Sequence, residues 1–526
     1  MNSFVDPLLG GLALLGDPAI WVAIVIGTLF GVITGALPGL GTTLAYALIL
    51  PFTFPLEIEV AVALLLAVTV GVQYGNSIPA ILVGVPGTPA AVLTVLDGYA
   101  LHRRGETGLA LGLAFIAAIG GQLVSTLFFV AAIVPLGGIA YYFLQPELFS
   151  LYLVGIVAII SLTGKNMIKG LMAATVGLLL ALIGLDPVNF TPRFDFGIPQ
   201  LRTGLNTSAV VIGFLAVSEL LRQTRQAFQW ESGPTKVSAT FPPFSKIRRT
   251  LPAMLGGTVV GTLVGAIPGA GATPAAMISY QQAQIFSKHP EEFGNGSPEG
   301  IAANEAAQNA SSSGELIPTL GLGLPGSGSM VLLLAALTLN GFVPGPNLVR
   351  EAPELLHAVI AGLIGASLLL LVTGWPMARA MTGLLGINRS VVVVLALATV
   401  VLGVYSLRYR MFDVVVCFVC GALGYFMLRY GYSVAAAALA VVLAAGFEAS
   451  LRRGLSIFDD DLGQFLGRPI TAVILTIAAA FFVLGVRRTV LSARAARAEK
   501  AATRTTDDAP PALATSTPPP RREDLE

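Results

Sequence analysis

Charged residues are scarce in this chain. Only 11% of its 526 residues are Asp, Glu, Lys or Arg, and 55% are hydrophobic, whereas water-soluble domains usually carry about 25% charged residues. This composition excludes an ordinary water-soluble surface. Apolar runs long enough to cross a hydrocarbon core about 30 Å thick recur along the chain, and they lack the alternation of a β-barrel. We therefore predict an all-α polytopic membrane protein with about 12 transmembrane helices plus re-entrant or broken half-helices.

Groups that could carry catalysis or bind a metal are also few. The chain has two cysteines and three histidines. Cys417 and Cys420 lie in an apolar run without a neighbouring histidine or carboxylate, so we interpret them as packing residues. The serine run at 311–313 has no histidine partner, and no nucleotide-binding motif is present. We therefore expect no enzyme, no cofactor, no ATPase and no nucleic-acid ligand.

Lys and Arg collect in a few segments, at 102–104, at 222–249 and from Arg487 onward. Such segments face the cytoplasm in membrane proteins. From Ala501 onward the chain is rich in Thr, Ala, Pro and charge, which is typical of disorder. We divide the chain into an N-terminal segment (1–18), a first repeat half with following transmembrane helices (19–221), a cytoplasmic linker (222–250), a second repeat half with following transmembrane helices (251–490) and a disordered cytoplasmic tail (491–526).

The chain repeats one Gly/Pro pattern. The nine residues Gly35–Thr43 recur as Gly265–Thr273 with six identities. Downstream, an Ile-Pro pair precedes a Pro-Gly pair by the same interval in both halves, and a Leu-Asp/Asn-Gly-aromatic sequence follows each. Interrupted hydrophobic segments at matching positions of duplicated halves are typical of secondary transporters with a site at the repeat interface. We predict two homologous repeats and expect them to be inverted.

The repeated motifs predict broken helices. Proline ends or kinks a helix, and the glycines after it permit positive φ and close backbone approach. The exposed N–H groups of the next half-helix can hold an anion, and unwound carbonyls can hold a cation. We predict substrate binding by Thr42, Thr43, Asn76, Ser77, Thr88, Thr273, Asn309, Ser311 and Ser327. We assign a structural and ion-binding motif to Pro38, Gly39, Gly41, Pro86, Gly87, Pro268, Gly269, Gly271, Pro325 and Gly326.

Neither motif region contains a side-chain cation, since no Lys or Arg precedes Arg103 and none lies between Lys288 and Arg350. Two helix starts supply about one positive charge in total. A di- or tricarboxylate held there would need co-bound cations, so we predict coupling to sodium or protons. A sodium site is expected near Gly39, Gly41, Gly269, Gly271 and Glu305, with protonation of Glu305 or Glu315 as the alternative.

Two other interpretations stay open from these residues. Gly and Pro are common in membrane helices and often serve only close packing, so either motif alone would be structural. Broken half-helices also build the selectivity filters of ion or solute channels. The duplication of the whole pattern favours a transporter.

The quoted motifs resemble those of the TctA-type permeases of the tripartite tricarboxylate transporter family. The likeness is carried by Gly35–Thr43, Tyr74–Leu82, Val85–Ala91, Leu96–Tyr99 and Pro298–Asn309, and it extends over roughly residues 15–490. The chain departs from the family pattern at Asn76, where a glycine is common, at Asn304, where a proline is common, and at Gln308, where an asparagine is common.

What the resemblance implies is a permease in a bacterial inner (cytoplasmic) membrane, with its C-terminus in the cytoplasm. Its partners would be a small four-helix membrane subunit and a periplasmic solute-binding protein. Transport would be secondary active symport, typically sodium-linked, of citrate or other organic carboxylates. Because of these departures, the resemblance leaves open which carboxylate is the substrate, citrate or another.

Overall fold

The computed structural model describes residues 5–37, 39–139, 142–163, 167–186, 191–224, 241–384 and 389–507. Within these ranges the chain is helical apart from loops and one two-stranded antiparallel sheet of β1 (Gly184–Leu185) and β2 (Pro192–Arg193). The prediction of an all-α membrane protein is thereby confirmed. Among the described residues, seven helices are long and apolar enough to cross a membrane, and six shorter apolar helices accompany them. The predicted number of about 12 spans stays a prediction.

The helices of the first part of the chain are α1 (Val5–Leu14), α2 (Pro18–Ala36), α3 (Thr42–Ile49), α4 (Ile58–Gly75), α5 (Ser77–Leu82), α6 (Val92–Thr94), α7 (Ala100–Arg103), α8 (Thr107–Ile139), α9 (Gln145–Thr163), α10 (Met167–Ala181), α11 (Thr207–Ile212) and α12 (Ser218–Gln223). Those of the second part are α13 (Phe244–Gly265), α14 (Ala272–Phe286), α15 (Pro298–Gly321), α16 (Gly328–Leu339), α17 (Leu348–Glu351), α18 (Pro353–Leu384), α19 (Arg389–Arg408), α20 (Met411–Arg429), α21 (Val434–Ile457), α22 (Leu462–Leu466) and α23 (Pro469–Asp507). Two π-helical segments, η3 (Val95–Tyr99) and η6 (Gly213–Val217), continue α6 and α11.

Two helix pairs touch backbone to backbone. A Cβ atom added to Gly31 of α2 would lie 2.4 Å from the carbonyl oxygen of Val68 in α4, and one added to Gly71 would lie 2.5 Å from that of Thr28. The pair α13 and α15 packs in the same way, because a Cβ on Gly261 would lie 2.4 Å from the carbonyl oxygen of Ala307. Small residues at such interfaces allow close van der Waals packing without a hydrophobic driving force.

Each half of the chain packs one of its long helices against the other half. Helix α8, from the first half, packs along α15 of the second half, and α18 of the second half packs along α4 of the first. Helix α15 is polar and almost completely buried between α8, α13 and α14. Helix α15 is not one of the apolar runs of the sequence, because its burial comes from these neighbours and not from its own hydrophobicity.

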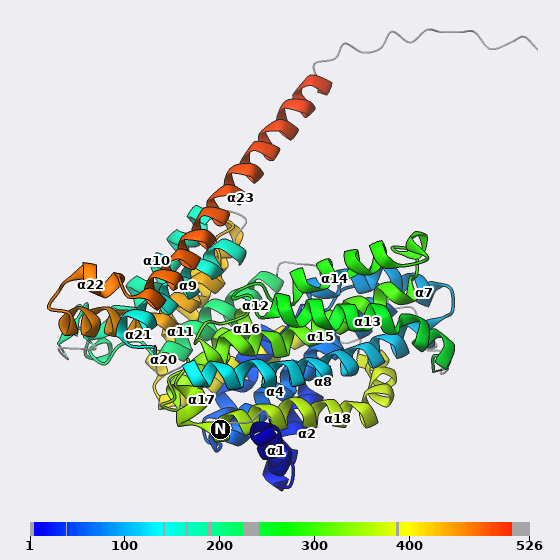
Figure 1. Cartoon of the computed structure of the whole chain (residues 1–526), viewed down its shortest axis with the longest axis horizontal. Coiled ribbons are helices and arrows are strands. Elements are labelled where there is room, and N and C mark those ends of the chain that lie inside the picture. Colours follow the sequence, from blue (N-terminus) through cyan, green and yellow to red (C-terminus); the bar gives the residue numbers. More distant parts are fainter. Residues whose placement is uncertain are drawn as a thin grey trace, which may run out of the picture.

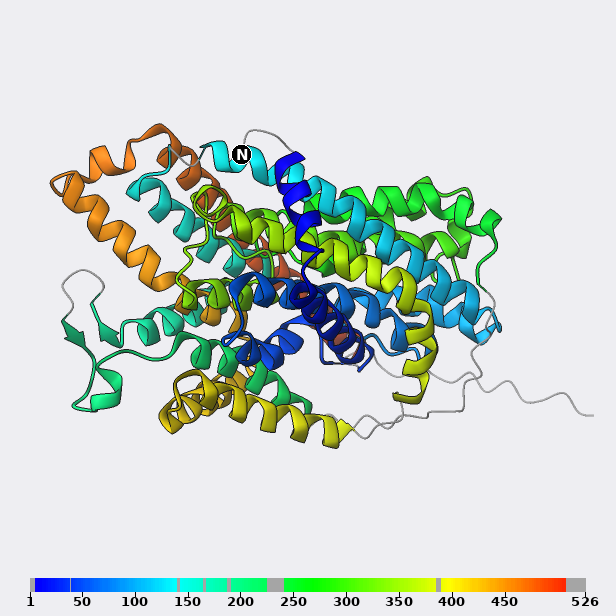
Figure 2. The ribbon, with the colours of Figure 1, turned by 90° about the horizontal axis from the view of Figure 1, so that it is seen from below.

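The long helices form two groups (Figures 1 and 2). We call α1, α2, α4, α8, α13, α14, α15 and α18 the motif core, and α9, α10, α11, α12, α20, α21 and α23 the side bundle. Contacts within each group are extensive, and α3 and α16 lie between the groups. This grouping crosses the predicted division of the chain, since helices that follow both repeat halves assemble in the side bundle.

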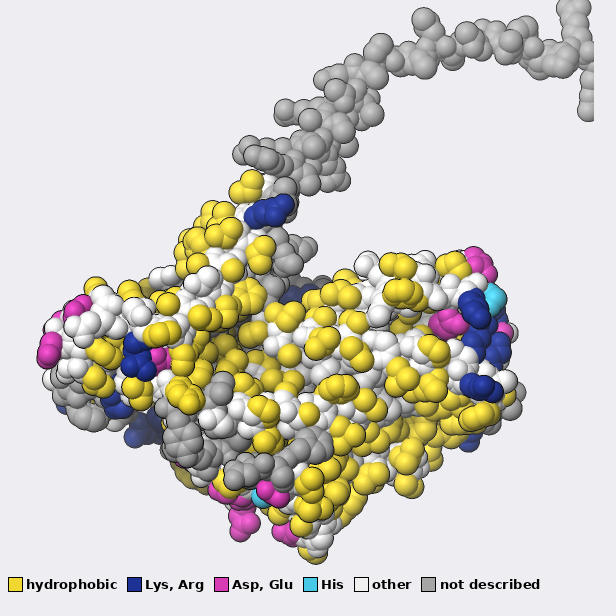
Figure 3. All heavy atoms as spheres, viewed as in Figure 1, with side chains coloured by type: hydrophobic (Ala, Val, Ile, Leu, Met, Phe, Trp, Pro, Cys, Tyr) yellow, Lys and Arg dark blue, Asp and Glu magenta, His cyan; other side chains and the backbone are white. Residues whose placement is uncertain are grey.

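The surface between the charged ends of the molecule is apolar. Figure 3 shows hydrophobic side chains over much of the face in view, with charged side chains mainly at its left and right ends and along its lower edge. Large apolar side chains such as Leu263, Val372 and Val394 are 64–75% exposed. A surface of this kind suits contact with lipid.

Helix α23 differs from the predicted disordered tail. It continues to Asp507, so residues 491–507 of the predicted tail are helical. The physical reason is local composition, because this stretch is rich in Ala, Arg, Lys and Glu, which favour helix, and it contains no Gly or Pro. The remainder of the predicted tail, and residues 225–240 of the predicted linker, lie outside the described residues.

Candidate functional site

A polar cavity of about 400 Å³ lies where the motif core meets the side bundle. This volume falls within the range of roughly 300–1,000 Å³ that small-molecule sites occupy. Both Gly/Pro motifs contribute to its wall, although they are more than 200 residues apart in the sequence. The wall contains residues of α3, α4, α12, α14, α15, α16, α20 and α21 and of the loop at 87–90.

Three helices begin at the cavity. Thr42 and Thr43 open α3, Ala272 and Thr273 open α14, and Ser329 lies in the first turn of α16. None of the three helices has a side-chain hydrogen bond from its N-cap residue. The first N–H groups of each therefore stay available at the cavity, and each helix start carries about half a positive charge.

The helix breaks in the two halves have matching geometry. Gly39 and Gly269 both have positive φ, 88° and 77°, a conformation that glycine adopts without strain. The N–H of Gly39 donates to the carbonyl of Gly87 at 3.3 Å, and the N–H of Gly269 donates to that of Pro325 at 3.1 Å. Each break thus closes onto the Pro-Gly turn of its own half. Whether the two halves are inverted stays a prediction.

The Pro-Gly turns rest on different residues in the two halves. A Cβ on Gly87 would lie 2.8 Å from Asn76, and one on Gly326 would lie 2.6 Å from the Cβ of Glu315. Glu315 lines the cavity, and its Oε2 accepts a hydrogen bond of 2.5 Å from Ser327 Oγ. The second half therefore places a buried carboxylate at the position where the first half has a neutral amide.

Arg222 is a cavity residue that the sequence prediction missed. It lies in α12 and lines the cavity beside Ser218 and Glu219. Its Nε and Nη2 donate to both carboxylate oxygens of Glu219, at 2.8 and 2.6 Å. The motif regions contain no Lys or Arg, as the sequence analysis stated, but the cavity wall includes Arg222, which we assigned to the cytoplasmic linker. The sequence feature that points to Arg222 is its spacing of three from Glu219 at the end of an apolar run, which predicts an ion pair between them but not its place at the cavity.

Five of the predicted substrate-binding side chains come together at the cavity, and four do not. Those in its wall are Thr42, Thr43, Thr88, Thr273 and Ser327. Asn76 and Ser77 are buried behind it, where the Nδ2 of Asn76 donates to Gln73 and Gln308 at 3.3 Å each and the hydroxyl of Ser77 donates to the carbonyl of Tyr74. Asn309 and Ser311 instead donate to the backbone of α15 itself.

The predicted structural motif lies at the same breaks. Gly39, Gly41 and Gly87 line the cavity, and Gly271 is the N-cap of α14. The remaining described members, which are Pro86, Pro268, Gly269, Pro325 and Gly326, lie at the breaks without belonging to the wall. Pro38 lies outside the described residues.

Glu305 lies away from the cavity, in a buried polar cluster of α15. Thr94 donates to Glu305 Oε1, and Asn304 Nδ2 donates to the Thr94 hydroxyl at 2.6 Å. The other oxygens, Glu305 Oε2 and Asn304 Oδ1, are buried without a hydrogen-bond partner, as is Oδ1 of Asn76. Buried polar atoms normally have a partner. Carboxylate and amide oxygens are the ligands that suit a hard cation, and Thr94 links Glu305 to Asn304, so these two oxygens are candidate ligands.

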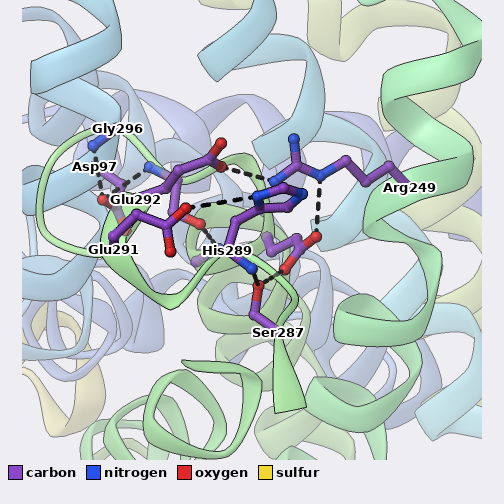
Figure 4. A network of polar contacts seen from close by, with 10 residues as sticks. Asp97, Arg249, Ser287, His289, Glu291, Glu292 and Gly296 are labelled. Carbon is purple, nitrogen blue, oxygen red and sulfur yellow. Dashed lines mark hydrogen bonds and ion pairs between the residues drawn. The ribbon is translucent and has the colours of Figure 1, made fainter. Parts of the chain in front are cut away.

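Asp97 is the link between the first Leu-Asp-Gly-Tyr sequence and the second half. Its carboxylate accepts hydrogen bonds from the N–H groups of Gly296 and Ser297, both at 2.9 Å, and from the Tyr280 hydroxyl at 2.8 Å. Asp97 is buried in the π-helical segment η3, and it holds the start of α15 (Figure 4).

Replacing Asp97 with alanine should destabilise the protein. The change leaves two buried N–H groups and one hydroxyl without an acceptor, at a cost of about 1–3 kcal/mol each when a donor stays buried. We expect a clear fall in the melting temperature of the detergent-purified protein. Tyr280→Phe removes one donor together with its need for an acceptor, and should shift the melting temperature much less. Equal shifts for the two variants would contradict this role.

Long buried helices, an apolar belt and a polar cavity between broken helices define a multi-pass helical membrane protein. Residues 21–439 match the model of the tripartite tricarboxylate transporter TctA family. The chain belongs to this family, as the motif resemblance predicted. Family membership also indicates a transport protein of a tripartite system and not an enzyme.

Two proteins of Agrobacterium vitis are similar to the chain. One, named "Uncharacterized 52.8 kDa protein in TAR-I ttuC' 3'region", is 34% identical over 469 residues, which cover 89% of this chain and 93% of that protein. The other, named "Uncharacterized protein in TAR-II ttuC' 3'region", is 33% identical over 234 residues, covering 44% of this chain and 97% of that protein. No solved structure matches the chain.

Proposed function

We propose that the chain is the permease subunit of a secondary transporter that imports di- or tricarboxylates, or related organic anions, with a sodium or proton gradient. The observation that carries this proposal is the convergence of three uncapped helix starts and Arg222 on one cavity. Helix N-termini and arginine are both suited to binding carboxylates. Hydroxyls of Thr42, Thr43 and Thr273 stand beside these groups and can orient the anion.

The charges at the cavity support cation coupling. Three helix starts supply roughly 1.5 positive charges, to which Arg222 adds one. Glu219 and Glu315 oppose them in the same wall. A substrate with two or three carboxylates would leave the loaded cavity strongly negative, and uncompensated charge within a membrane costs at least about 3 kcal/mol. A co-transported cation, held at Glu315 or in the oxygen cluster around Glu305, removes this excess.

The family belongs to a tripartite system, and we propose the corresponding partners for this chain. They are a periplasmic solute-binding protein, which delivers the anion, and a small four-helix membrane subunit. The proposed location is a bacterial inner membrane with the C-terminus in the cytoplasm. Helix α23 contains the last apolar span, Pro469–Arg487, and carries Arg487 and Arg488 at the end of that span, which agrees with this orientation.

Reconstituted uptake tests the proposal. The permease, the small subunit and the binding protein would be placed in proteoliposomes, and uptake of labelled di- and tricarboxylates measured with an inward sodium gradient, with a proton gradient and with neither. We expect saturable uptake that requires one of the gradients and the binding protein. Liposomes without the binding protein are the control. Passive, non-saturating flux that is independent of both gradients would contradict the transporter proposal and support the alternative of an ion or solute channel.

A further inference from the structure

A second cavity, distinct from the polar cavity, runs between α13 and α14 at the charged end of the motif core. It has a volume of about 790 Å³ and is lined by the first turns of α13, the last turns of α14 and the residues just beyond α14. We call it the lateral groove. None of its lining residues belongs to the wall of the polar cavity, so the proposed transport function does not use it.

One end of the lateral groove is cationic. Its lining holds Arg248, Arg249 and Lys288 against one carboxylate, Glu299, which gives a net charge of +2 with His289 neutral. Arg249 is already engaged, because its Nε donates to Glu299 at 3.0 Å and its Nη2 to Glu292 at 2.7 Å (Figure 4). Arg248 and Lys288 form no ion pair with any residue that the structure describes. Arg248 and Lys288 therefore face the groove without ion-pair partners of their own among the described residues, beside an Arg249–Glu292–Glu299 group whose net charge is −1.

The rest of the lateral groove is open and mostly apolar, with Ser245, Ser279, Gln282 and Ser287 as its polar members. Pro252, Ala253 and Gly256 of α13 and Ala283 and Phe286 of α14 line it. Gly256 leaves the floor wide, since even an added Cβ would have no neighbour closer than 3.7 Å. Outside the groove the same two helices carry exposed apolar side chains, among which Ile285 and Leu263 are 78% and 65% exposed. These helices thus present an apolar face of the kind that contacts lipid.

Cations at one end of an apolar groove on such a face match one kind of ligand. We propose that the lateral groove binds an anionic phospholipid, with its phosphate at Arg248 and Lys288 and an acyl chain along Pro252 and Gly256. Basic pockets between membrane helices on the cytoplasmic side recognise anionic headgroups in this way. A free organic anion would satisfy the cations but not the apolar floor. The proposal requires only that the chain is a membrane protein, and does not depend on carboxylate transport.

Native mass spectrometry of the full-length protein, exchanged into detergent with defined lipid, tests the proposal. We expect the wild-type protein to retain phosphatidylglycerol in preference to phosphatidylcholine. In the double variant R248Q/K288Q the ratio of phosphatidylglycerol to phosphatidylcholine retained should fall by about 30-fold, because each Lys or Arg near an anionic lipid contributes roughly a factor of five. Arg103→Gln is the matched control, since Arg103 is an exposed cation of α7 outside the lateral groove. Retention unchanged in the double variant, or lowered equally by Arg103→Gln, would overturn the proposal.

Two further experiments test whether the phosphate belongs to a lipid or to a soluble anion, and whether the apolar part of the lateral groove contributes to binding. Gly256→Leu fills the groove without changing charge, and it should lower phosphatidylglycerol retention while the melting temperature in phosphatidylcholine stays near that of the wild type. Glycerol phosphate without acyl chains should bind far more weakly than phosphatidylglycerol. If glycerol phosphate bound equally well and Gly256→Leu had no effect, the groove would be a site for a soluble anion and the lipid proposal would fail.

Discussion

Replacing Glu315 with glutamine is expected to lower gradient-driven uptake by roughly 5- to 150-fold, the range that typical coupling free energies cover. Glu315 is 3% exposed, lines the polar cavity and accepts a hydrogen bond from Ser327. A carboxylate there opposes an anionic substrate unless a proton or a cation neutralises it. Glutamine preserves the shape and can still accept the hydrogen bond from Ser327, but it neither takes up a proton nor attracts a cation.

The measurement compares two assays on the same proteoliposomes. Uptake against a concentration gradient should fall in Glu315→Gln, whereas exchange of labelled for unlabelled substrate should continue, because exchange needs no net cation movement. If protons are the coupling ion, wild-type uptake will rise as the external pH falls and the variant will lose this dependence. If sodium is the coupling ion, wild-type uptake will depend on the sodium gradient, and the variant will lose this dependence. Glu106→Gln, at an exposed loop position, is the control. Full gradient-driven uptake in Glu315→Gln would exclude Glu315 from coupling.

Replacing Arg222 with glutamine is expected to raise the KM for a dicarboxylate by about 5- to 30-fold. A charge-assisted hydrogen bond contributes about 1.5–3 kcal/mol, and the lower end applies because the Arg222 side chain is 45% exposed and screened by water. The prediction for Glu219→Gln has the opposite sign. This change removes the carboxylate that competes for Arg222, so it should lower the KM.

The pair of variants separates substrate binding from general damage. Both substitutions break the same ion pair between Glu219 and Arg222, so a merely structural effect would move the KM or the amount of folded protein in the same direction for both. Opposite shifts in KM are expected only if Arg222 contacts the anion. Arg103→Gln provides a matched loss of one exposed cation and should leave the KM unchanged. An unaltered KM in Arg222→Gln would show that the helix starts bind the anion without it.

Much of the candidate site could be predicted because it is built from backbone geometry. Proline and glycine determine where a helix can break, so the repeated spacing located the starts of α3 and α14 and the turns that close on them. Thr42, Thr43, Thr88, Thr273 and Ser327 follow these breaks directly and therefore lie at the cavity. The local conformation leaves little freedom for their placement.

The other predicted residues were misplaced relative to the cavity because side-chain direction within a continuous helix depends on its neighbours. Asn76 joins α4 to α15 through Gln308, and Asn309 and Ser311 bond to their own helix. The rotation of α15 about its own axis is set by its packing between α8 and α13, and the sequence alone does not determine it. For the same reason Arg222 could not be assigned to the cavity, since only the assembly of the side bundle brings α12 against the motif core.

The backbone-to-backbone contacts also have a mechanical consequence. Where α2 meets α4 and α13 meets α15, the glycines bring the two backbones into direct contact, and this close contact makes each pair resist sliding. The crossed packing of α8 and α18 ties the two pairs into one rigid block. The side bundle joins this block through far fewer residues, and the polar cavity lies along that seam. Displacement of the side bundle against the motif core is therefore the least costly movement that would change access to the cavity.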